Sequence, residues 1–193
     1  MYLKPFLIPA LIPIAWTIEN NQVRRLLTVS LFFSFLGDVF LILEGQLFFI
    51  LGLVSFLLAH IFYITLSLRF ISLSIHFKLS ILTGLFFFLY LISFLRFLAP
   101  YLGELLIPVI IYALVLAFFG MIGCLIYLKH RSVPSLFLMF GSLFFIASDS
   151  LLASATFVQT FSLHHFWVML TYLIAQYCIV FGFSNNSISS SKF

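Results

Sequence analysis

The stretch LFFSFLGDVFLIL, residues 31–43, is apolar except for one serine, one glycine and Asp38. The stretch LFFIASDSLLA, residues 143–153, encloses Asp149 in the same way. Apolar runs of this density are typical of membrane-spanning helices, in which an ionisable side chain costs roughly 2.5–3.5 kcal/mol on insertion scales. Acidic residues are therefore rare at such places without a function, and Asp38 and Asp149 are the first candidates for functional residues.

The composition of the whole chain agrees with a membrane location. Of its 193 residues, 64% are hydrophobic, 20% are aromatic and 7% are charged, whereas a soluble domain has about 25% charged residues. So little polar surface excludes a soluble domain, and the sequence predicts an all-α, polytopic membrane helix bundle. The net charge of +4 does not indicate nucleic-acid binding, because the basic residues are scattered over the loops singly or in pairs.

Seven apolar runs are long enough to cross a bilayer, which takes about 17–25 residues. They form one transmembrane domain over residues 1–183, followed by a short polar tail at residues 184–193. The first run is expected to be retained, because three prolines interrupt it and no small-residue cleavage site of a signal peptide follows. The predicted spans are residues 3–18, 26–43, 47–67, 79–98, 105–128, 134–153 and 165–183.

The basic residues favour one orientation of these spans. Two of them, Lys4 and Arg96, fall on one side of the membrane together with Glu44 and Glu104. The other seven fall on the opposite side, at Arg24, Arg25, Arg69, Lys78, Lys129, Arg131 and Lys192. Because cytoplasmic loops carry the excess of Lys and Arg, we expect the N-terminus outside and the C-terminus in the cytoplasm. A bacterial inner membrane is the expected location.

Polar residues recur at helical spacing on four of the predicted spans. Positions three, four, seven or eleven apart share one face of a helix, so each of these spans carries one polar stripe. The stripes are Ser34 with Asp38; His60 with Tyr63, following Gly52 and Phe56; Ser148 with Asp149, following Gly141 and Phe145; and Tyr172 with Gln176, following His165. Polar groups within membranes face the interior of a bundle, so we expect the four stripes to meet in one cavity.

The depth of these residues predicts where the cavity opens. Asp38 lies ~9 Å below Glu44 at 1.5 Å per residue, and Tyr112 lies about two turns below Glu104. Asp149 lies about one turn from the outer end of its span. The cavity is therefore expected to open to the outer leaflet, with His60 and Gln176 at its floor.

A structural interpretation is open for most of these residues. His60 could serve only as a hydrogen-bond donor between helices, and Tyr112 and Tyr172 could be aromatic residues of the membrane interface. The two cysteines, Cys124 and Cys178, lie inside apolar runs and are expected to pack rather than to bind metal or form a disulfide. The His164–His165 pair with Trp167 is more typical of an interface anchor than of a metal site. For Asp38 and Asp149 a function is the default interpretation.

Five segments of the sequence resemble the YhhN-type lysoplasmalogenase family of integral membrane proteins. They are LKPFLIPAL (3–11), FLGDVFLIL (35–43), GLVSFLLAHIFY (52–63), GSLFFIASDSLLA (141–153) and YLIAQYCIV (172–180), and they occur in the family's order. Family members usually have eight predicted spans, with a helix before the Lys-Pro motif. That helix is expected to be absent here. By position, the resemblance implicates Lys4, Asp38, His60, Tyr63, Asp149, Tyr172 and Gln176, and also Tyr112.

The resemblance implies hydrolysis of the vinyl-ether bond of a lysoplasmalogen, a single-chain ether phospholipid. Products would be a fatty aldehyde and glycerophosphoethanolamine or glycerophosphocholine, and neither a metal nor an organic cofactor is expected. Protonation of the vinyl β-carbon gives an oxocarbenium ion that water captures, so a proton donor and a nearby anion are needed, as in glycoside hydrolysis. Asp38 as the acid with Asp149 as the anion, or the reverse, would suit. Lys4 would meet the phosphate, and Glu104 or an aromatic face would meet the head-group cation.

Three other functions are weighed against this one. A small transporter or channel could use intramembrane Asp and His to carry protons, but no inverted repeat is apparent. An intramembrane aspartyl protease would carry Gly-x-Gly-Asp, whereas residues 35–38 read FLGD. A non-catalytic lipid-binding protein would pair its carboxylates with His60 or Lys4. Neither the head-group preference nor the oligomeric state follows from the sequence.

Overall fold

The chain was described from a computed structural model, which covers residues 4–70 and 77–185, with side chains from residue 8 and, after the gap, from residue 78. Within these residues the chain is helical and has no strand, as the sequence predicts. The α-helices are α1 (Lys4–Trp16), α2 (Asn21–Ile42), α3 (Gln46–Leu68), α4 (Phe77–Leu102), α5 (Leu106–His130), α6 (Val133–Ala153) and α7 (His164–Ser184). A 3-10 turn, η1 (Gly103–Leu105), precedes α5, and a π-helical turn, η2 (Ser154–Val158), continues α6.

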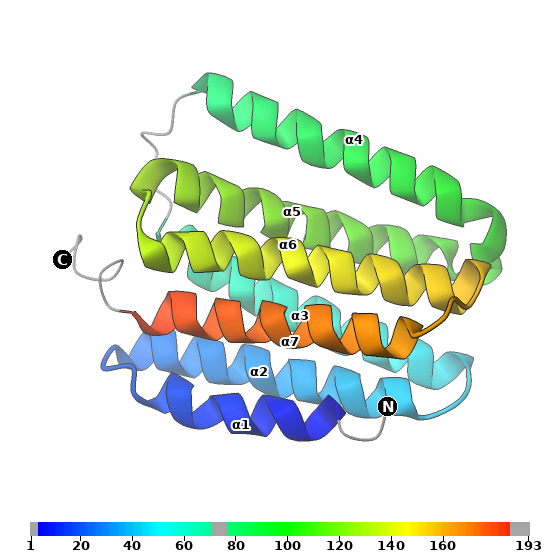
Figure 1. Cartoon of the computed structure of the whole chain (residues 1–193), viewed down its shortest axis with the longest axis horizontal. Helices are drawn as coiled ribbons and strands as arrows, with labels where there is room; N and C mark the ends of the chain where they lie inside the picture. The colour runs from blue at the N-terminus through cyan, green and yellow to red at the C-terminus, as the bar shows by residue number, and fades with distance from the viewer. Residues whose placement is uncertain (1–3, 71–76, 186–193) are drawn as a thin grey trace.

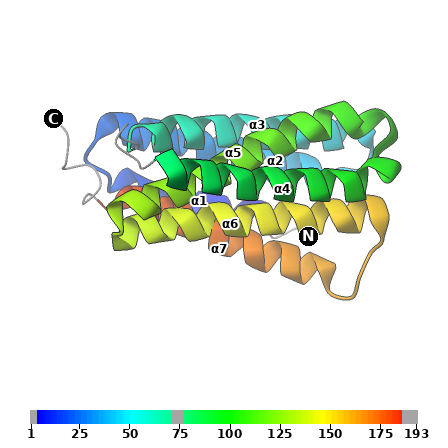
Figure 2. The same ribbon diagram turned by 90° about the horizontal axis from the view of Figure 1, so that it is seen from above.

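The helices lie roughly along one axis and form a single bundle (Figures 1 and 2). Helix α4 lies at one edge of it, and α1 and α2 lie at the opposite edge (Figure 1). The most extensively packed pairs are α6 with α7 and α2 with α3, while α5 contacts α3, α4 and α6. Helix α4 packs chiefly on α5 and η2, so it forms a wall of the bundle rather than part of its centre.

Apolar segments of membrane-spanning length account for most of this bundle. Five of them occur in the described residues, and the one at Lys78–His130 contains both α4 and α5. The other four are Asn21–Ile42, Gln46–Leu68, Val133–Val158 and His164–Ser184. The described part of α1 has 13 residues, fewer than a span requires. The chain is therefore a multi-pass membrane helix bundle, while the count of seven spans stays a prediction.

Glycines allow two of the helix pairs to approach closely. A Cβ atom at Gly141 of α6 would lie 2.9 Å from the backbone nitrogen of Ile179 of α7. On α2, a Cβ atom at Gly37 would lie 2.6 Å from the ring of Phe56 of α3. Small residues permit such approaches in membrane proteins, where packing and hydrogen bonds replace the hydrophobic driving force. Gly37 thereby admits Phe56 beside Asp38, the next residue on α2.

Local sequence features explain where α6 begins, and its other end continues into a π-turn. Before its first turn the Ser132 Oγ accepts a hydrogen bond from the Ser135 backbone N–H (3.4 Å), and Pro134 lies in the first turn, as predicted. The sequence predicts that the span ends at residue 153. The α-helix does end at Ala153, but the chain remains helical through η2 to Val158. Such π-turns are rare and frequently occur at functional sites. This one carries Phe157 to the edge of the cavity described below.

Candidate functional site

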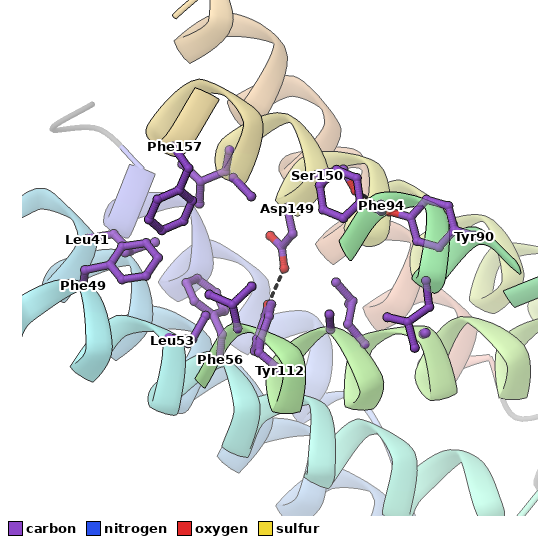
Figure 3. Close-up of a pocket in the computed structure, with 17 residues that line it drawn as sticks. Leu41, Phe49, Leu53, Phe56, Tyr90, Phe94, Tyr112, Asp149, Ser150 and Phe157 are labelled. Atoms are coloured by element: carbon purple, nitrogen blue, oxygen red, sulfur yellow. Dashed lines mark hydrogen bonds between the residues drawn. The ribbon is translucent and has the colours of Figure 1, made fainter. Parts of the chain in front are cut away.

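A small cavity of about 70 Å³ lies between helices α2 to α6, with η2 at one side. Its polar lining side chains are Tyr90, Tyr112, Asp149 and Ser150. The remaining lining residues are apolar: Leu41, Phe49, Leu53, Phe56, Leu91, Phe94, Val109, Ala113, Leu116, Ala117, Leu152, Ala153 and Phe157 (Figure 3). A space of this size with a few convergent polar groups can hold water beside a short piece of a ligand.

Asp149 points into this cavity from α6 toward Tyr112 of α5 (Figure 3). The Tyr112 hydroxyl donates a hydrogen bond to Asp149 Oδ2. At the next residue of α6, the hydroxyl oxygens of Ser150 and Tyr90 are 2.5 Å apart. Because Ser150 already donates to the Ile146 carbonyl (2.6 Å), Tyr90 is the donor to Ser150. Two tyrosines therefore donate toward α6, one of them directly to the carboxylate.

Asp38 belongs to a second cluster, which is buried between α2, α3 and α7. The Tyr172 hydroxyl donates to Asp38 Oδ2 at 2.8 Å, and Gln176 Nε2 donates to the same hydroxyl at 3.4 Å. The Tyr63 hydroxyl in turn donates to Gln176 Oε1 at 2.8 Å. Asp38, Tyr63 and Gln176 are fully buried, and Tyr172 is 1% exposed. The polar stripes predicted on these three helices do face one another.

His60 of α3 lies between the two clusters. Its ring centroid is 5.7 Å from that of Tyr112, 6.3 Å from that of Tyr63 and 4.4 Å from that of Phe145. His60 Nδ1 is 2.7 Å from the Phe56 carbonyl oxygen, which can only accept, so Nδ1 carries the proton. Nε2 then has a lone pair, and it is buried without a hydrogen-bond partner in the described part of the chain.

The sequence predicts that the two carboxylates share one cavity, but Asp149 lines the cavity and Asp38 does not. Asp149 and Tyr112 line the 70 Å³ cavity, whereas Asp38, His60 and Gln176 do not. Phe56 stands between: it lines the cavity, and its ring centroid is 6.0 Å from that of Tyr172, the residue that donates to Asp38. Helical periodicity gives the direction of a side chain, but it does not reveal that a large ring fills the space between two stripes.

The predicted head-group residues lie away from the cavity. Glu104 is exposed on η1 at the end of the bundle. It is not among the residues that line the cavity. Lys4 begins α1, but its side chain lies outside the described residues. Their roles toward a head group remain predictions.

A second hollow of about 500 Å³ opens beside the cavity, and no pattern in the sequence indicates it. We call it the end basin. It shares Leu41, Phe49, Leu152 and Phe157 with the cavity, and its other lining residues are Leu43, Gly45, Gln46, Leu105, Thr156 and His165. These residues come from loops and helix ends that are distant in sequence, so no spacing pattern could have revealed it.

Thiols and metal ligands take no visible part in either cluster. Cys124 and Cys178 are free thiols that pack within apolar helices. Residues 8–70 and 78–185 contain no group of three or more His, Cys, Asp or Glu side chains placed to hold one metal ion.

Comparison with known proteins gives a family and no individual relative. No significant match was found among curated proteins or among solved structures. A family model described as the YhhN family matches residues 1–183. This range contains both aspartate clusters and all seven helices described here, except Ser184, the last residue of α7. The match covers nearly the whole sequence, and the chain therefore belongs to the YhhN family.

Proposed function

We propose that this protein is a membrane hydrolase that cleaves the vinyl-ether bond of lysoplasmalogens. The products are a fatty aldehyde and glycerophosphoethanolamine or glycerophosphocholine. The observation that carries the proposal is a carboxyl group, Asp149, in the wall of an otherwise largely apolar cavity, with the Tyr112 hydroxyl bonded to it. Membership of the YhhN family supports the same activity.

The first step is transfer of a proton from Asp149 to the β-carbon of the vinyl ether. Asp149 accepts the Tyr112 hydrogen bond at Oδ2 and, in its protonated form, delivers the acidic proton. The electron pair of the carbon–carbon double bond forms the new C–H bond. Positive charge then develops on the ether carbon and oxygen, as an oxocarbenium ion. Proton transfer from a positioned side chain typically contributes about 10²–10⁴-fold to a rate.

In the second step the Asp149 carboxylate faces the cation that it has created. Tyr112 stabilises this carboxylate through a charge-assisted hydrogen bond. A water molecule attacks the ether carbon and gives a proton to Asp149. This attack forms a hemiacetal. The hemiacetal collapses when Asp149 protonates the glycerol oxygen, the bond from the carbon to that oxygen breaks, and the hemiacetal hydroxyl gives its proton to Asp149 as the aldehyde forms. One water is consumed, and one aldehyde and one alcohol are formed.

Asp38 acts in this proposal as a positioning residue rather than as the acid. Of the two assignments that the sequence leaves open, the lining of the cavity favours Asp149 as the proton donor. Asp38 accepts from Tyr172, and Tyr172 and Phe145 pack against the ring of Phe56 at the cavity wall (6.0 and 6.1 Å between centroids). The Asp38 cluster thereby holds the wall that Asp149 faces.

We also propose seven spans, with the N-terminus outside and the C-terminus in the cytoplasm of a bacterial inner membrane. One end of the bundle carries most of the basic residues in the described part of the chain, and the other end carries Glu44 and Glu104. The excess of Lys and Arg favours the basic end as cytoplasmic. The end basin lies near Glu44, so the site would open toward the outer leaflet.

The test is aldehyde release by purified protein in detergent micelles. The substrate is a lysoplasmalogen, and the matched control lipid has the same head group and a saturated ether chain. We expect stoichiometric aldehyde and glycerophospho-alcohol from the vinyl ether only. Binding of both lipids without any aldehyde would contradict the proposal and favour a non-catalytic lipid-binding protein, and flux of unchanged solute into proteoliposomes would favour a transporter.

A further inference from the structure

The end basin is lined by polar side chains without a carboxylate, whereas the cavity contains Asp149. Its polar side chains are Gln46 at the start of α3, Thr156 in η2 and His165 in the first turn of α7. All three are exposed, so none of them is needed to fill the packed interior. Their side chains offer an amide N–H, a hydroxyl and a ring N–H, and none of the described residues that line the basin is acidic.

The end basin and the cavity adjoin through an apolar boundary. Leu41, Phe49, Leu152 and Phe157 line both spaces, and the rings of Phe49 and Phe157 pack edge to face with centroids 5.3 Å apart. Figure 3 shows Phe157, Leu41 and Phe49 on one side of Asp149, and Tyr90 and Phe94 on the other. Asp149 therefore lies between the end basin and the part of the cavity that Tyr90 and Phe94 line.

This order matches the order of groups in the proposed substrate. In a lysoplasmalogen the vinyl-ether bond lies between the glycerophospho group and the hydrocarbon chain. When that bond is beside Asp149, the two parts of the lipid must leave in opposite directions. The lining beyond Asp149, which is apolar except for Tyr90 and Ser150, suits the first carbons of the chain, and the end basin holds polar side chains on the other side.

We propose that the end basin binds the phosphate of a single-chain phospholipid through Gln46, Thr156 and His165. The inference rests on the proposed function for the placement of the lipid. Three hydrogen-bond donors without a carboxylate among them suit a phosphodiester anion and do not suit the cation of a head group. The sequence assigned phosphate recognition to Lys4, whereas the end basin would recognise it independently of that residue.

Binding rather than turnover is the direct test. Two probes with the same hexadecyl chain are compared on purified protein in detergent: an O-alkyl lysophosphocholine, whose saturated ether cannot undergo the proposed reaction, and the O-alkyl glycerol without phosphate. The variant combines Gln46→Ala, Thr156→Val and His165→Ala. The matched control is His164→Ala, because His164 neighbours His165 but does not line the basin. Inorganic phosphate serves as a third probe.

We expect the triple variant to bind the phospholipid about tenfold or more weakly, since hydrogen bonds to a charged group are each worth about 1.5–3 kcal/mol. Binding of the alkyl glycerol should stay unchanged, and His164→Ala should behave as the wild type. Equal loss for both lipids, or no loss for either, would overturn the proposal. Inorganic phosphate that binds as tightly as the lipid would overturn it as well, because the ligand would then be the free anion.

Failure of the proposed function would look different. In that case the wild type releases no aldehyde from a lysoplasmalogen, yet the triple variant still loses its preference for the phosphate-bearing probe. This result would support the end basin as a phospholipid site in a protein that does not hydrolyse vinyl ethers. Aldehyde release with an unchanged phosphate preference in the triple variant would instead support the hydrolase and overturn the basin.

Discussion

Tyr112 of α5 and Asp149 of α6 are joined by a hydrogen bond from the tyrosine hydroxyl to carboxylate Oδ2, at the wall of the cavity. Tyr112 is 8% exposed, so this hydrogen bond forms at a largely buried residue. The bond directs the Asp149 carboxylate toward α5. It also gives the carboxylate a donor whose contribution grows when the carboxylate is charged.

Replacing Asp149 should remove the reaction and leave the protein folded. Asp149→Asn keeps the shape and can still accept from Tyr112, but it cannot deliver a proton, so aldehyde release should fall by about 10²–10⁴-fold. Glu44→Gln is the control, because Glu44 is an exposed acid that lines neither the cavity nor the end basin. An Asp149→Asn protein that retains the wild-type rate would exclude Asp149 as the acid.

Tyr112→Phe should slow aldehyde release less than Asp149→Asn does. It removes one charge-assisted hydrogen bond, worth about 1.5–3 kcal/mol, and hence about 10–100-fold in kcat if the bond acts chiefly in the transition state. Binding of the saturated-ether analogue should be unchanged, since it carries no developing charge. A change in analogue binding equal to the change in kcat/KM would mean that Tyr112 only shapes the cavity.

The Asp38–Tyr172 pair should behave as one unit. Tyr172→Phe removes the donor at 2.8 Å from Asp38 Oδ2, and removing one partner of a buried hydrogen bond costs about 1–3 kcal/mol. Asp38→Asn, Tyr172→Phe and the double variant form a cycle, in which the double variant should lose less stability than the two singles together. Thermal unfolding in detergent measures this, with Tyr101→Phe on the exposed end of α4 as the control.

The same cycle separates a positioning role from a purely structural one. If Asp38 positions the cavity wall, kcat should fall in Asp38→Asn and recover in part in Asp38→Glu, with little change in KM. Strict additivity of the two single variants, in stability and in kcat, would contradict the direct coupling of Asp38 and Tyr172.

Replacing His60 should affect the stability and the activity of the protein differently. Its Nε2 is buried without a partner in the described part of the chain, and an unsatisfied buried polar atom costs about 1–3 kcal/mol. His60→Phe replaces it by an apolar ring among the aromatic side chains that already surround it. We expect an unchanged or higher unfolding temperature together with lower aldehyde release.

His130→Phe is the matched control for this experiment. His130 Nε2 is 2.9 Å from the Phe70 carbonyl oxygen at the other end of the bundle. Its replacement should lower stability by about 0.5–1.5 kcal/mol and leave aldehyde release unchanged. Full activity of His60→Phe would show that His60 only links helices, which is the structural interpretation of its place in the sequence.

The helices were predictable because each long apolar run in the sequence of a membrane protein indicates a helix. The predicted run at residues 165–183 is α7 (His164–Ser184). The run at 26–43 begins earlier, at Asn21, because Asn20 caps α2 with its side chain, which accepts from the Gln22 backbone N–H at 3.0 Å. Helix α4 passes Pro100 and ends at Leu102 rather than at residue 98. A proline in the last turn costs little when neighbouring groups satisfy the freed carbonyl.

The arrangement of the polar side chains was predictable only in part. Helical offsets correctly grouped Asp38, Tyr63, Tyr172 and Gln176 on facing stripes, since periodicity fixes the face of a helix. They could not separate Asp149 from Asp38, because the ring of Phe56 looks like any other apolar residue in sequence. They also gave no indication of η2, since a π-turn depends on one extra residue per turn and not on a change of composition.

The orientation of the bundle can be tested by labelling single cysteines. Cys124→Ser and Cys178→Ser give a background without thiols, into which Glu44→Cys or Arg131→Cys is introduced at exposed positions on opposite ends. A membrane-impermeant maleimide applied to intact bacterial spheroplasts should label Glu44→Cys and should not label Arg131→Cys until the membrane is opened. The reverse pattern would invert the proposed topology and place the end basin on the cytoplasmic side.

The contact of α6 with α7 holds Asp149 beside the rest of the site, and Gly141→Ala should weaken it. The added Cβ would lie 2.9 Å from the Ile179 backbone nitrogen and 3.1 Å from the Ala175 carbonyl oxygen, and neither backbone atom can move without shifting its helix. Overpacking of this kind costs about 1–3 kcal/mol. Gly84→Ala is the control, because the Cβ added there would meet the flexible end of Met121 at 3.7 Å, an ordinary van der Waals contact. Since Ala also favours helix over Gly by about 0.8–1.0 kcal/mol, Gly84→Ala should raise the unfolding temperature in detergent while Gly141→Ala lowers it. Equal effects of the two substitutions would mean that the close approach of α6 and α7 contributes nothing to stability.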